Sequence, residues 1–180
     1  MSCTTSRTLH GLPFECDPSR PGVEEIYLAN YGDVVPTVDT DLTSTSAMTV
    51  TNLSGGTWYK YELPKNTASL SSPISVSDDG RVTYTNTISM QFNKLMAYKH
   101  AELASICKGY IIAIVKDRNG KYWFVGYDEY LAPTDGNAET GASTSDRNGY
   151  TLTIAAESAF LPFEVPASVM AGITVAEYPA

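Results

Sequence analysis

The chain has 180 residues, the length of one domain or of one domain with long arms, and can bury a sizeable core. Its formal net charge of −8 argues against a domain that binds nucleic acid through phosphates, which needs clustered Lys and Arg. It does not argue against a wall past which DNA slides. Only 18% of the residues are charged and 43% are hydrophobic, which favours a sheet protein whose uncharged polar surface lies against another subunit. The alternative is an ordinary β-domain with a Thr-rich, solvated surface.

Three cysteines, Cys3, Cys16 and Cys107, cannot all pair within one chain, and their spacing matches no zinc pattern. They indicate reduced thiols in a protein assembled in the cytoplasm. No apolar run approaches membrane-spanning length, and residues 1–7 contain no hydrophobic signal region, so we expect neither a membrane nor a secreted role.

Residues 1–22 are rich in the turn formers Gly and Pro, which predicts an extended N-terminal arm before a single domain over residues 23–180. Residues 24–30 predict the first strand. A hairpin is predicted over residues 47–63, with its turn at the Ser-Gly-Gly sequence 54–56.

The clearest strand signal is the alternation over residues 81–90, where one face is apolar except for Asn86. The other face is a ladder of hydroxyl groups without charge. In a monomer this face would be solvated, whereas in a ring it could line a lumen or a subunit contact. The residues of this candidate lumen or interface face are Thr83, Thr85, Thr87 and Ser89.

Apolar residues at helical spacing predict a helix over residues 92–108, which ends at Gly109 and packs on a sheet. Cys107 falls on the apolar stripe, so we expect it in the core.

The sequence Asp-Arg-Asn-Gly at 117–120 lies between two apolar runs and predicts a hairpin over residues 110–127 with a type I′ turn. Residues 111–115 are nearly all apolar, so this strand should be covered on both faces. The same four letters at 146–149 predict a second turn of the same type before a strand at 150–154.

Residues 131–149 contain almost no apolar residue and predict a long loop, which in a compact domain is usually functional or disordered. We expect this loop to make assembly contacts. Its candidate residues are Asp135, Asn137, Glu139, Asp146 and Arg147.

Catalytic motifs are absent from the sequence, which contains only two histidines, His10 and His100. No nucleophile elbow, Walker loop or metalloprotease motif is present. Residues 117–120 lack the remaining ligand spacing of a calcium loop, and adjacent acids at turns are usually solvated. We therefore predict a non-enzymatic protein with no catalytic, cofactor-binding or metal site.

Three blocks of the sequence resemble a family of small virion proteins from phages and prophages of Bacteroidetes, the tail-tube-like or tail-ring proteins. The first block is Cys16 together with Gly-Val-Glu-Glu-Ile-Tyr-Leu-Ala-Asn at 22–30. The second covers 92–126 and consists of the predicted helix, an apolar strand, Asp-x-Asn-Gly and Tyr-Trp-Phe-Val-Gly. The third lies within 140–153, where Thr-Gly is followed by Asp-Arg-Asn-Gly-Tyr-Thr-Leu-Thr. The resemblance departs at Pro21, where a second glycine is expected, and residues 39–76 have no counterpart.

The resemblance implies a mainly β fold with one flanking α-helix, a β-sandwich or barrel of the tail-tube type. It implies a virion protein of the phage tail or neck, assembled in the host cytoplasm. Its copies would close into a ring, expected to be a hexamer, stack with other rings and contact other tail or neck proteins. DNA would pass through the lumen without specific binding.

A rival hypothesis from a different class is a carbohydrate-binding or adhesin β-sandwich. It depends on aromatic rings exposed together on one face, where sugars could stack. The alternative for each ring is core packing. The candidate rings are Trp58, Tyr59, Tyr61, Tyr122, Trp123 and Tyr127.

Overall fold

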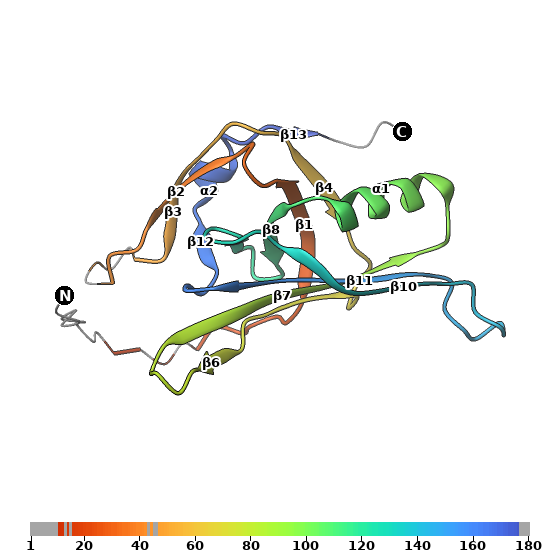
Figure 1. Cartoon of the computed structure of the whole chain (residues 1–180), viewed down its shortest axis with the longest axis horizontal. Coiled ribbons are helices and arrows are strands. Elements are labelled where there is room, and N and C mark those ends of the chain that lie inside the picture. Colours follow the sequence, from red (N-terminus) through yellow and green to blue (C-terminus); the bar gives the residue numbers. More distant parts are fainter. Residues whose placement is uncertain (1–10, 13, 15, 43, 45–46, 177–180) are drawn as a thin grey trace.

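The structure, a computed structural model of the chain, describes residues 11–12, 14, 16–42, 44 and 47–176. These residues form thirteen strands and two helices, arranged as two open sheets packed face to face (Figure 1). The mainly β, sandwich-like fold class is confirmed. Part of the predicted arm at 1–22 lies outside the described residues, as do Cys3 and His10.

The larger sheet has eight strands. In spatial order they are β13 (Val175–Ala176), β4 (Trp58–Glu62), β1 (Val23–Asn30), β8 (Ile111–Asp117), β9 (Tyr122–Val125), β12 (Phe163–Val165), β3 (Thr49–Ser54) and β2 (Val35–Asp39).

The smaller sheet has five strands. Four of them follow the order β10 (Ala132–Glu139), β11 (Gly149–Ser158), β7 (Val82–Asn93) and β5 (Ala68–Ser71), and the fifth, β6 (Ile74–Val76), pairs with β7 on the same side as β5.

One hydrophobic cluster fills the space between the two sheets. It contains Ile26 and Leu28 of β1 on one side, and Ile88 and Met90 of β7 on the other. Each strand contributes every second residue, as the alternation of side chains along a strand requires. The predicted inward face of residues 81–90 is therefore correct along its buried part.

A second cluster covers the opposite face of the eight-stranded sheet. Val50 of β3 and Trp58 of β4 both belong to it, although these strands lie near opposite ends of the strand order. The sheet must therefore curl around this cluster. The short helix α2 (Ala167–Met170), which the sequence did not predict, contributes partly buried Val169 and Met170.

The central strand β8 is buried on both faces, as predicted. Ile111, Ala113 and Val115 join the cluster between the sheets, whereas Ile112 and Ile114 join the second cluster.

The predicted hairpin over residues 47–63 is wrong, although both of its strands exist. β3 pairs with β2 and β12, whereas β4 pairs with β1 and β13. Gly56 has a φ of +66°, and a Cβ there would lie 2.5 Å from the side chain of Val34. The turn therefore passes close to residues 33–34, just before β2, and the chain then continues to β4 near the other end of the strand order. The sequence did not predict β2, because Pro36 argues against a strand. Proline is tolerated here because β2 lies at the edge of the sheet.

The helix α1 (Ala97–Lys108) begins five residues later than predicted. Phe92 is part of β7 and pairs with Tyr150 of β11. Lys94 has a φ of +64°, in the left-handed region, where the chain leaves the strand. Gly109 follows the helix as its C-cap, as expected.

The predicted core position of Cys107 is also wrong, because this side chain is exposed. Leu103 and Ile106 do pack on the cluster between the sheets. The predicted apolar stripe includes Phe92, Leu95 and Met96, which all precede the helix. The helix is further held by Tyr61 of β4, whose hydroxyl donates a hydrogen bond to Glu102.

The first Asp-Arg-Asn-Gly sequence forms the predicted hairpin turn between β8 and β9, but not the predicted turn type. Only Gly120 has a positive φ, at +80°, so the turn is not type I′. Asp117 accepts hydrogen bonds from the amides of Asn119 and Lys121 and from the Trp123 indole.

The second copy of these four letters is not a turn of the same type, which corrects that prediction. Gly149 begins β11, and a Cβ there would lie 2.1 Å from the carbonyl oxygen of Phe92. Asn148 accepts a hydrogen bond from the amide of Leu95 at 3.0 Å. This copy therefore secures the connection from β7 to α1.

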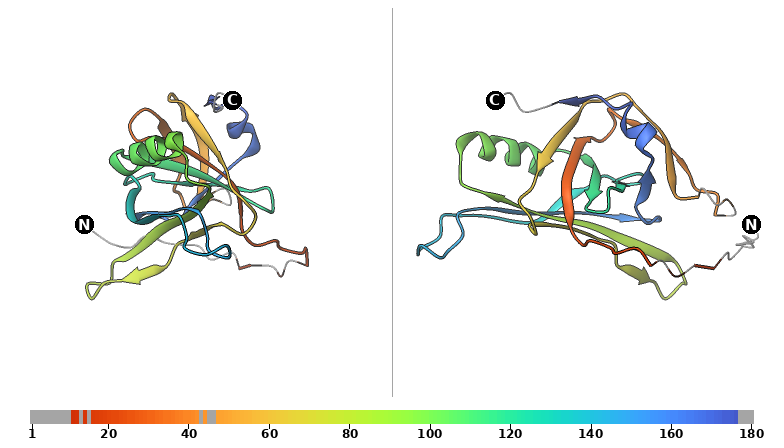
Figure 2. Two further views of the ribbon diagram at one scale, coloured as in Figure 1. Left: turned by 90° about the vertical axis from the view of Figure 1, so that its right-hand side faces the viewer. Right: turned by 180° about the vertical axis from the view of Figure 1, so that it is seen from behind.

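The predicted loop over residues 131–149 is wrong in its first half, because β10 occupies residues 132–139. β10 pairs with β11 from Ala132↔Ala155 to Glu139↔Gly149, and only residues 140–148 form a loop. The strand was missed because Ala, Pro, Asp, Gly and Asn have low β-propensity, and its order comes from pairing with β11. The tip of this hairpin projects at the end of the molecule opposite to β2 and β3 (Figures 1 and 2).

Candidate functional site

The hydroxyl residues predicted from the sequence lie on the solvent side of the five-stranded sheet, which we call the outer face. Thr83, Thr85, Thr87 and Ser89 alternate along β7 with residues that point to the core, and each is partly exposed.

The strand register extends this outer face across the sheet. Ser89 pairs with Thr153 of β11 on one side and with Ser69 of β5 on the other. Asp135 of β10 pairs with Thr153 in turn. Paired residues lie on the same face of a sheet, so one row of hydroxyl and carboxylate groups crosses four strands.

Three of the predicted assembly residues therefore join the hydroxyl ladder on one surface. Asp135, Asn137 and Glu139 share a face of β10, and Asn137 pairs with Thr151. No sequence pattern indicates that these residues share a surface, because their position depends on the register between β10 and β11.

The other two predicted assembly residues are used inside the hairpin loop. Asp146 accepts hydrogen bonds from the amides of Ala142 at 2.8 Å and Ser143 at 2.7 Å, and these lower the pKa of its carboxyl group. Arg147 donates hydrogen bonds to the carbonyl groups of Phe92 and Tyr150. Their roles in the structure are local: they shape the loop.

The five-stranded sheet contains no Lys or Arg in any of its strands, all of whose residues the structure describes. Its acidic residues are Asp135, Glu139 and Glu157. The outer face therefore combines hydroxyl groups with uncompensated negative charge.

Both edges of this sheet lack a further strand partner within the described part of the chain. β10 forms one edge, and β5 with β6 forms the other along β7. An unpaired edge offers backbone amide and carbonyl groups to another strand.

Apolar side chains are also exposed beside the second edge. Ile74 and Val76 of β6 are 63% and 67% exposed, and Val82 opposite Val76 is 46% exposed. In the described part of the arm, Leu12 and Phe14 are almost fully exposed.

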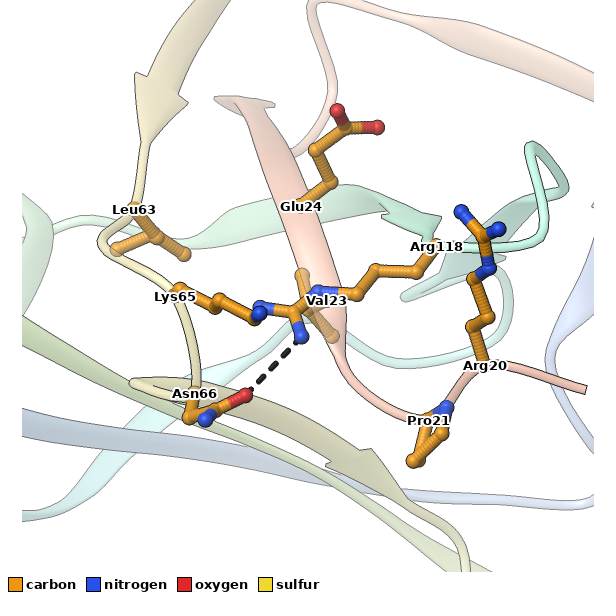
Figure 3. A pocket seen from close by; sticks show the side chains of 8 residues that line it. All are labelled: Arg20, Pro21, Val23, Glu24, Leu63, Lys65, Asn66 and Arg118. Atoms are coloured by element: carbon orange, nitrogen blue, oxygen red, sulfur yellow. Dashed lines mark hydrogen bonds between the residues drawn. The ribbon is translucent and has the colours of Figure 1, made fainter.

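A hollow that the sequence did not predict lies beside the connection from β4 to β5 and the start of β1, with a volume of about 590 Å³ (Figure 3). We call it the basic hollow, because three cations line it. Its lining residues are Arg20, Pro21, Val23, Glu24, Leu63, Lys65, Asn66 and Arg118.

Segments far apart in the sequence build this hollow. The backbone amide of Arg20 donates to the side-chain oxygen of Asn119 at 2.7 Å, and the amide of Arg118 donates to the carbonyl of Gly22 at 3.2 Å. The residues lining it have no common spacing in the sequence, so no pattern could have revealed it.

A second hollow of about 450 Å³ lies between α1 and β10. It contains His100 and Cys107, which are seven residues apart on α1 and so about 10 Å apart along the axis. That separation exceeds hydrogen-bond reach, so the two cannot act as a base and nucleophile pair. Among the described residues, no three His, Cys, Asp or Glu side chains gather closely enough to hold a metal ion.

The aromatic residues of the rival hypothesis do not form one exposed platform. Trp58 is fully buried, and Tyr122 and Tyr127 pack on the second cluster. Tyr61 packs on the first cluster, and Trp123 is partly buried. Of the six rings, only Tyr59 is largely exposed.

A different set of rings gathers at the surface. The Tyr130 ring lies 4.2 Å from Tyr110 and 6.0 Å from Tyr31, measured between ring centroids. Tyr110 is 62% exposed and Tyr31 is 43% exposed.

Comparisons of the chain with protein-family models, with curated proteins and with solved structures find no significant match. In the described part of the chain, neither helix has the length and apolarity needed to cross a membrane.

Proposed function

We propose that the chain is a non-enzymatic structural protein of a phage virion, a tail-tube subunit or a tail or neck ring subunit. Its copies would close into a ring around a conduit for DNA. One observation carries the proposal: a polar, cation-free sheet face is bounded on both sides by unpaired strand edges.

The two edges suit head-to-tail assembly. They belong to different strands, β10 and β5–β6, so a contact between them joins unlike surfaces. Such heterologous contacts close into rings when the rotation between neighbours allows it. Edge-to-edge pairing would also remove two exposed edges that otherwise favour aggregation.

The composition of the outer face suits a lumen. Proteins hold DNA through Lys and Arg contacts with phosphates, and their absence here removes the main source of nonspecific affinity. Carboxylates at Asp135 and Glu157 would repel the phosphates of passing DNA. In this arrangement the outer faces of neighbouring copies form the wall of the conduit.

The projecting tip of the β10–β11 hairpin supports stacking of rings. Residues 140–148 lie beyond the paired strands and are exposed except near the start of β11. Replacing 141–147 by two glycines should leave the sheet paired and the ring intact, but reduce the length of stacked tubes seen by electron microscopy.

The first test is negative-stain electron microscopy with mass photometry over a concentration series. Rings or tubes with a central hole, at a fixed subunit number, would support the proposal. A monomer at every concentration, including in the presence of the neighbouring virion proteins, would contradict it.

Labelling tests the assignment of the lumen. Thr87→Cys, in a chain whose native cysteines are replaced by Ser, should react with a small maleimide in both monomer and tube. A maleimide on a bulky polymer should react only with the monomer. Equal labelling of tube and monomer by the bulky reagent would place this face outside the conduit.

A second candidate function, a carbohydrate-binding module, is favoured only by the Tyr31, Tyr110 and Tyr130 cluster. Aromatic rings at a surface can stack on sugar faces. A glycan array separates the two functions: saturable binding that Tyr110→Ala abolishes would favour the binding module, and no binding is expected of a ring subunit.

A further inference from the structure

The basic hollow contains positive charge that the described part of the molecule does not neutralise. Arg20, Lys65 and Arg118 line it, and none of them forms an ion pair with a described residue. The one acid among its described lining residues, Glu24, is paired with Lys116 at 2.9 Å. In a chain with a formal net charge of −8, this hollow is a local excess of positive charge, which attracts anions.

The side chain of Arg118 is held in place by groups from two other segments. Its guanidinium donates a hydrogen bond to the side-chain oxygen of Asn66 at 3.0 Å. It also lies against the backbone of Gly22, where an added Cβ would be 3.4 Å from the guanidinium carbon. The amide of Arg118 donates to the carbonyl of Gly22 at 3.2 Å. A guanidinium fixed in this way loses little conformational entropy when it binds a ligand.

The residue that orients Arg118 has an unusual backbone conformation. Asn66 has a φ of +65°, in the left-handed region, which asparagine tolerates better than most residues but still at a cost in free energy. Residues held in such conformations cluster at ligand sites, where the surrounding structure maintains them. Here the strained residue provides the acceptor for the guanidinium.

The cations retain donors for a ligand. The guanidinium of Arg118 has five N–H groups, and within the described residues its side chain forms no hydrogen bond other than the one to Asn66. The side chain of Lys65 extends toward it from the opposite side, in front of Val23 (Figure 3). Two cations that converge without an acid between them repel each other, and a bound anion would relieve the repulsion. An oxyanion between them would accept charge-assisted hydrogen bonds from both side chains.

The remaining lining of the hollow is largely apolar. Val23 and Leu63 pack on the cluster between the sheets and also line the hollow, and Pro21 adds a third apolar side chain. The volume of about 590 Å³ lies within the range of small-molecule sites, which combine apolar walls with a few converging polar groups.

We propose that the basic hollow binds a small organic anion. Its phosphate or carboxylate group would lie between Lys65 and Arg118, and its apolar body would contact the apolar lining. This inference goes beyond the proposed function and does not depend on it, because the hollow is lined by no residue of the outer face or of β5, β6 and β10.

The ligand would join three segments that are far apart in the sequence. Arg20 belongs to the base of the arm before β1, Lys65 to the connection from β4 to β5, and Arg118 to the turn between β8 and β9. A ligand that binds only the folded chain stabilises it by mass action, so the melting temperature should rise with ligand concentration.

An NMR titration of the wild-type chain with phenyl phosphate at constant ionic strength tests the site. The amide signals of Gly22, Asn66 and Arg118 should shift together and saturate, with a dissociation constant of about 1 mM or tighter. Inorganic phosphate should bind more weakly because it lacks the apolar body, and benzyl alcohol should not bind because it lacks the charge. Benzoate distinguishes the two oxyanions: the tighter of benzoate and phenyl phosphate shows whether the hollow prefers a carboxylate or a phosphate.

Two variants test the roles of the cations. Arg118→Gln keeps a donor for Asn66 and should weaken phenyl phosphate binding by about tenfold or more, whereas Lys65→Gln should weaken it by about threefold. Lys108→Gln is the matched control, because it removes one charge from the exposed end of α1 and should bind like the wild type. Circular dichroism must first show that the variants are folded. If Arg118→Gln is not, Lys65→Glu takes its place, since this side chain is exposed and its reversed charge should abolish binding.

Three results would overturn the inference. The first is no saturable shift up to about 10 mM phenyl phosphate, and the second is a set of shifts that lies away from the hollow. The third is an equal loss in Arg118→Gln and Lys108→Gln, which would mean that net charge alone attracts the anion. Inorganic phosphate that binds as tightly as phenyl phosphate would overturn the assignment of the apolar body. All of these leave the proposed function intact, because ring formation is measured separately on the unliganded chain.

Discussion

The two sheets differ in the number of faces that the molecule covers. The eight-stranded sheet packs on one cluster between the sheets and curls around a second, so strands β1 and β8 are buried on both sides. The five-stranded sheet buries one face only, and its outer face is hydroxyl-rich and free of cations. The larger sheet therefore supplies stability, and the smaller one supplies the surface available for contacts.

Their charges follow the same division. The eight-stranded sheet contains Lys60 and Lys116, each within 3.0 Å of a glutamate oxygen. The five-stranded sheet contains acids without cations. Both lysines of the first sheet are paired with glutamates of the same sheet, whereas the strands of the second sheet contain no cation with which their acids could pair.

The largest effect should come from removing a large ring from the eight-stranded sheet. Phe124 is fully buried and contacts Trp58, with 6.5 Å between ring centroids. Phe124→Ala should lower the free energy of unfolding by about 3–5 kcal/mol, through lost burial and the cavity that remains. Guanidinium unfolding followed by circular dichroism measures this loss.

Thr87→Ala is the matched control on the five-stranded sheet, with an expected change within about 0.5 kcal/mol. If Phe124→Ala does not fold, Phe124→Leu should still unfold more easily than Thr87→Ala. Equal losses at the two positions would contradict the division between a stabilising sheet and a contact surface.

The two Asp-Arg-Asn-Gly sequences allow a comparison of identical letters in the two sheets. Gly149→Ala should cost about 3 kcal/mol, because the new Cβ would lie 2.1 Å from the backbone carbonyl of Phe92. Gly120→Ala should cost only about 1 kcal/mol, since its φ is +80° but the space around it is open. Chemical unfolding of both variants measures the difference, and a larger loss at Gly120 would refute the assigned roles.

The identical sequences also show where sequence reasoning succeeds and fails. Residues 111–115 are apolar at every position, so their burial on both faces followed from composition alone. The role of Gly149 could not be predicted from composition. It depends on how closely the backbone of β7 approaches Gly149, and tertiary packing sets that distance.

The candidate site divides in the same way. The hydroxyl ladder of β7 was predictable, because alternation along one strand is a local pattern. β10 was not, since Asp135 to Glu139 have little intrinsic preference for a strand and are ordered by pairing. The basic hollow combines residues 20, 65 and 118, which only the fold brings together.

A smaller effect is expected from the charge network of the eight-stranded sheet. Burial raises the pKa of the Glu25 carboxyl, but hydrogen bonds from Lys60 and Tyr27 and the charges of Lys116 and Lys60 outweigh it, so the pKa lies below the ordinary value of 4.5. Burial, together with the hydrogen bond to Glu25 and the negative charge of that carboxylate, raises the pKa of Tyr27 to about 12, although the charge of Lys60 acts in the opposite direction.

A carboxyl group with a lowered pKa in the folded state stabilises the protein above its unfolded pKa, and this contribution is lost as the pH falls through the folded value. Glu25→Gln should therefore destabilise by about 1 kcal/mol at neutral pH, and by less in acid. Unfolding at about pH 7 and about pH 3 measures this trend. Glu157→Gln on the outer face should show no such trend, and a matching trend there would contradict the difference between the sheets.

The smallest effect on stability, but a clear effect on binding, is expected from adding cations to the outer face. Thr85→Lys, Thr87→Lys and Thr151→Lys together should change the free energy of unfolding by no more than about 0.5 kcal/mol per site, because all three positions are partly exposed. The triple variant should gain weak affinity for duplex DNA that falls steeply with salt, with a logarithmic slope of about −2 to −3.

The control for this variant changes the net charge equally without placing cations on one face, by Asp78→Asn, Glu62→Gln and Glu129→Gln. Fluorescence anisotropy with labelled DNA should then detect binding only for the lysine variant. Equal binding by both would mean that net charge, and not the arrangement on the five-stranded sheet, keeps DNA away. The wild-type face would then have no special suitability as the wall of a conduit, and the edge-to-edge contacts alone would support the ring.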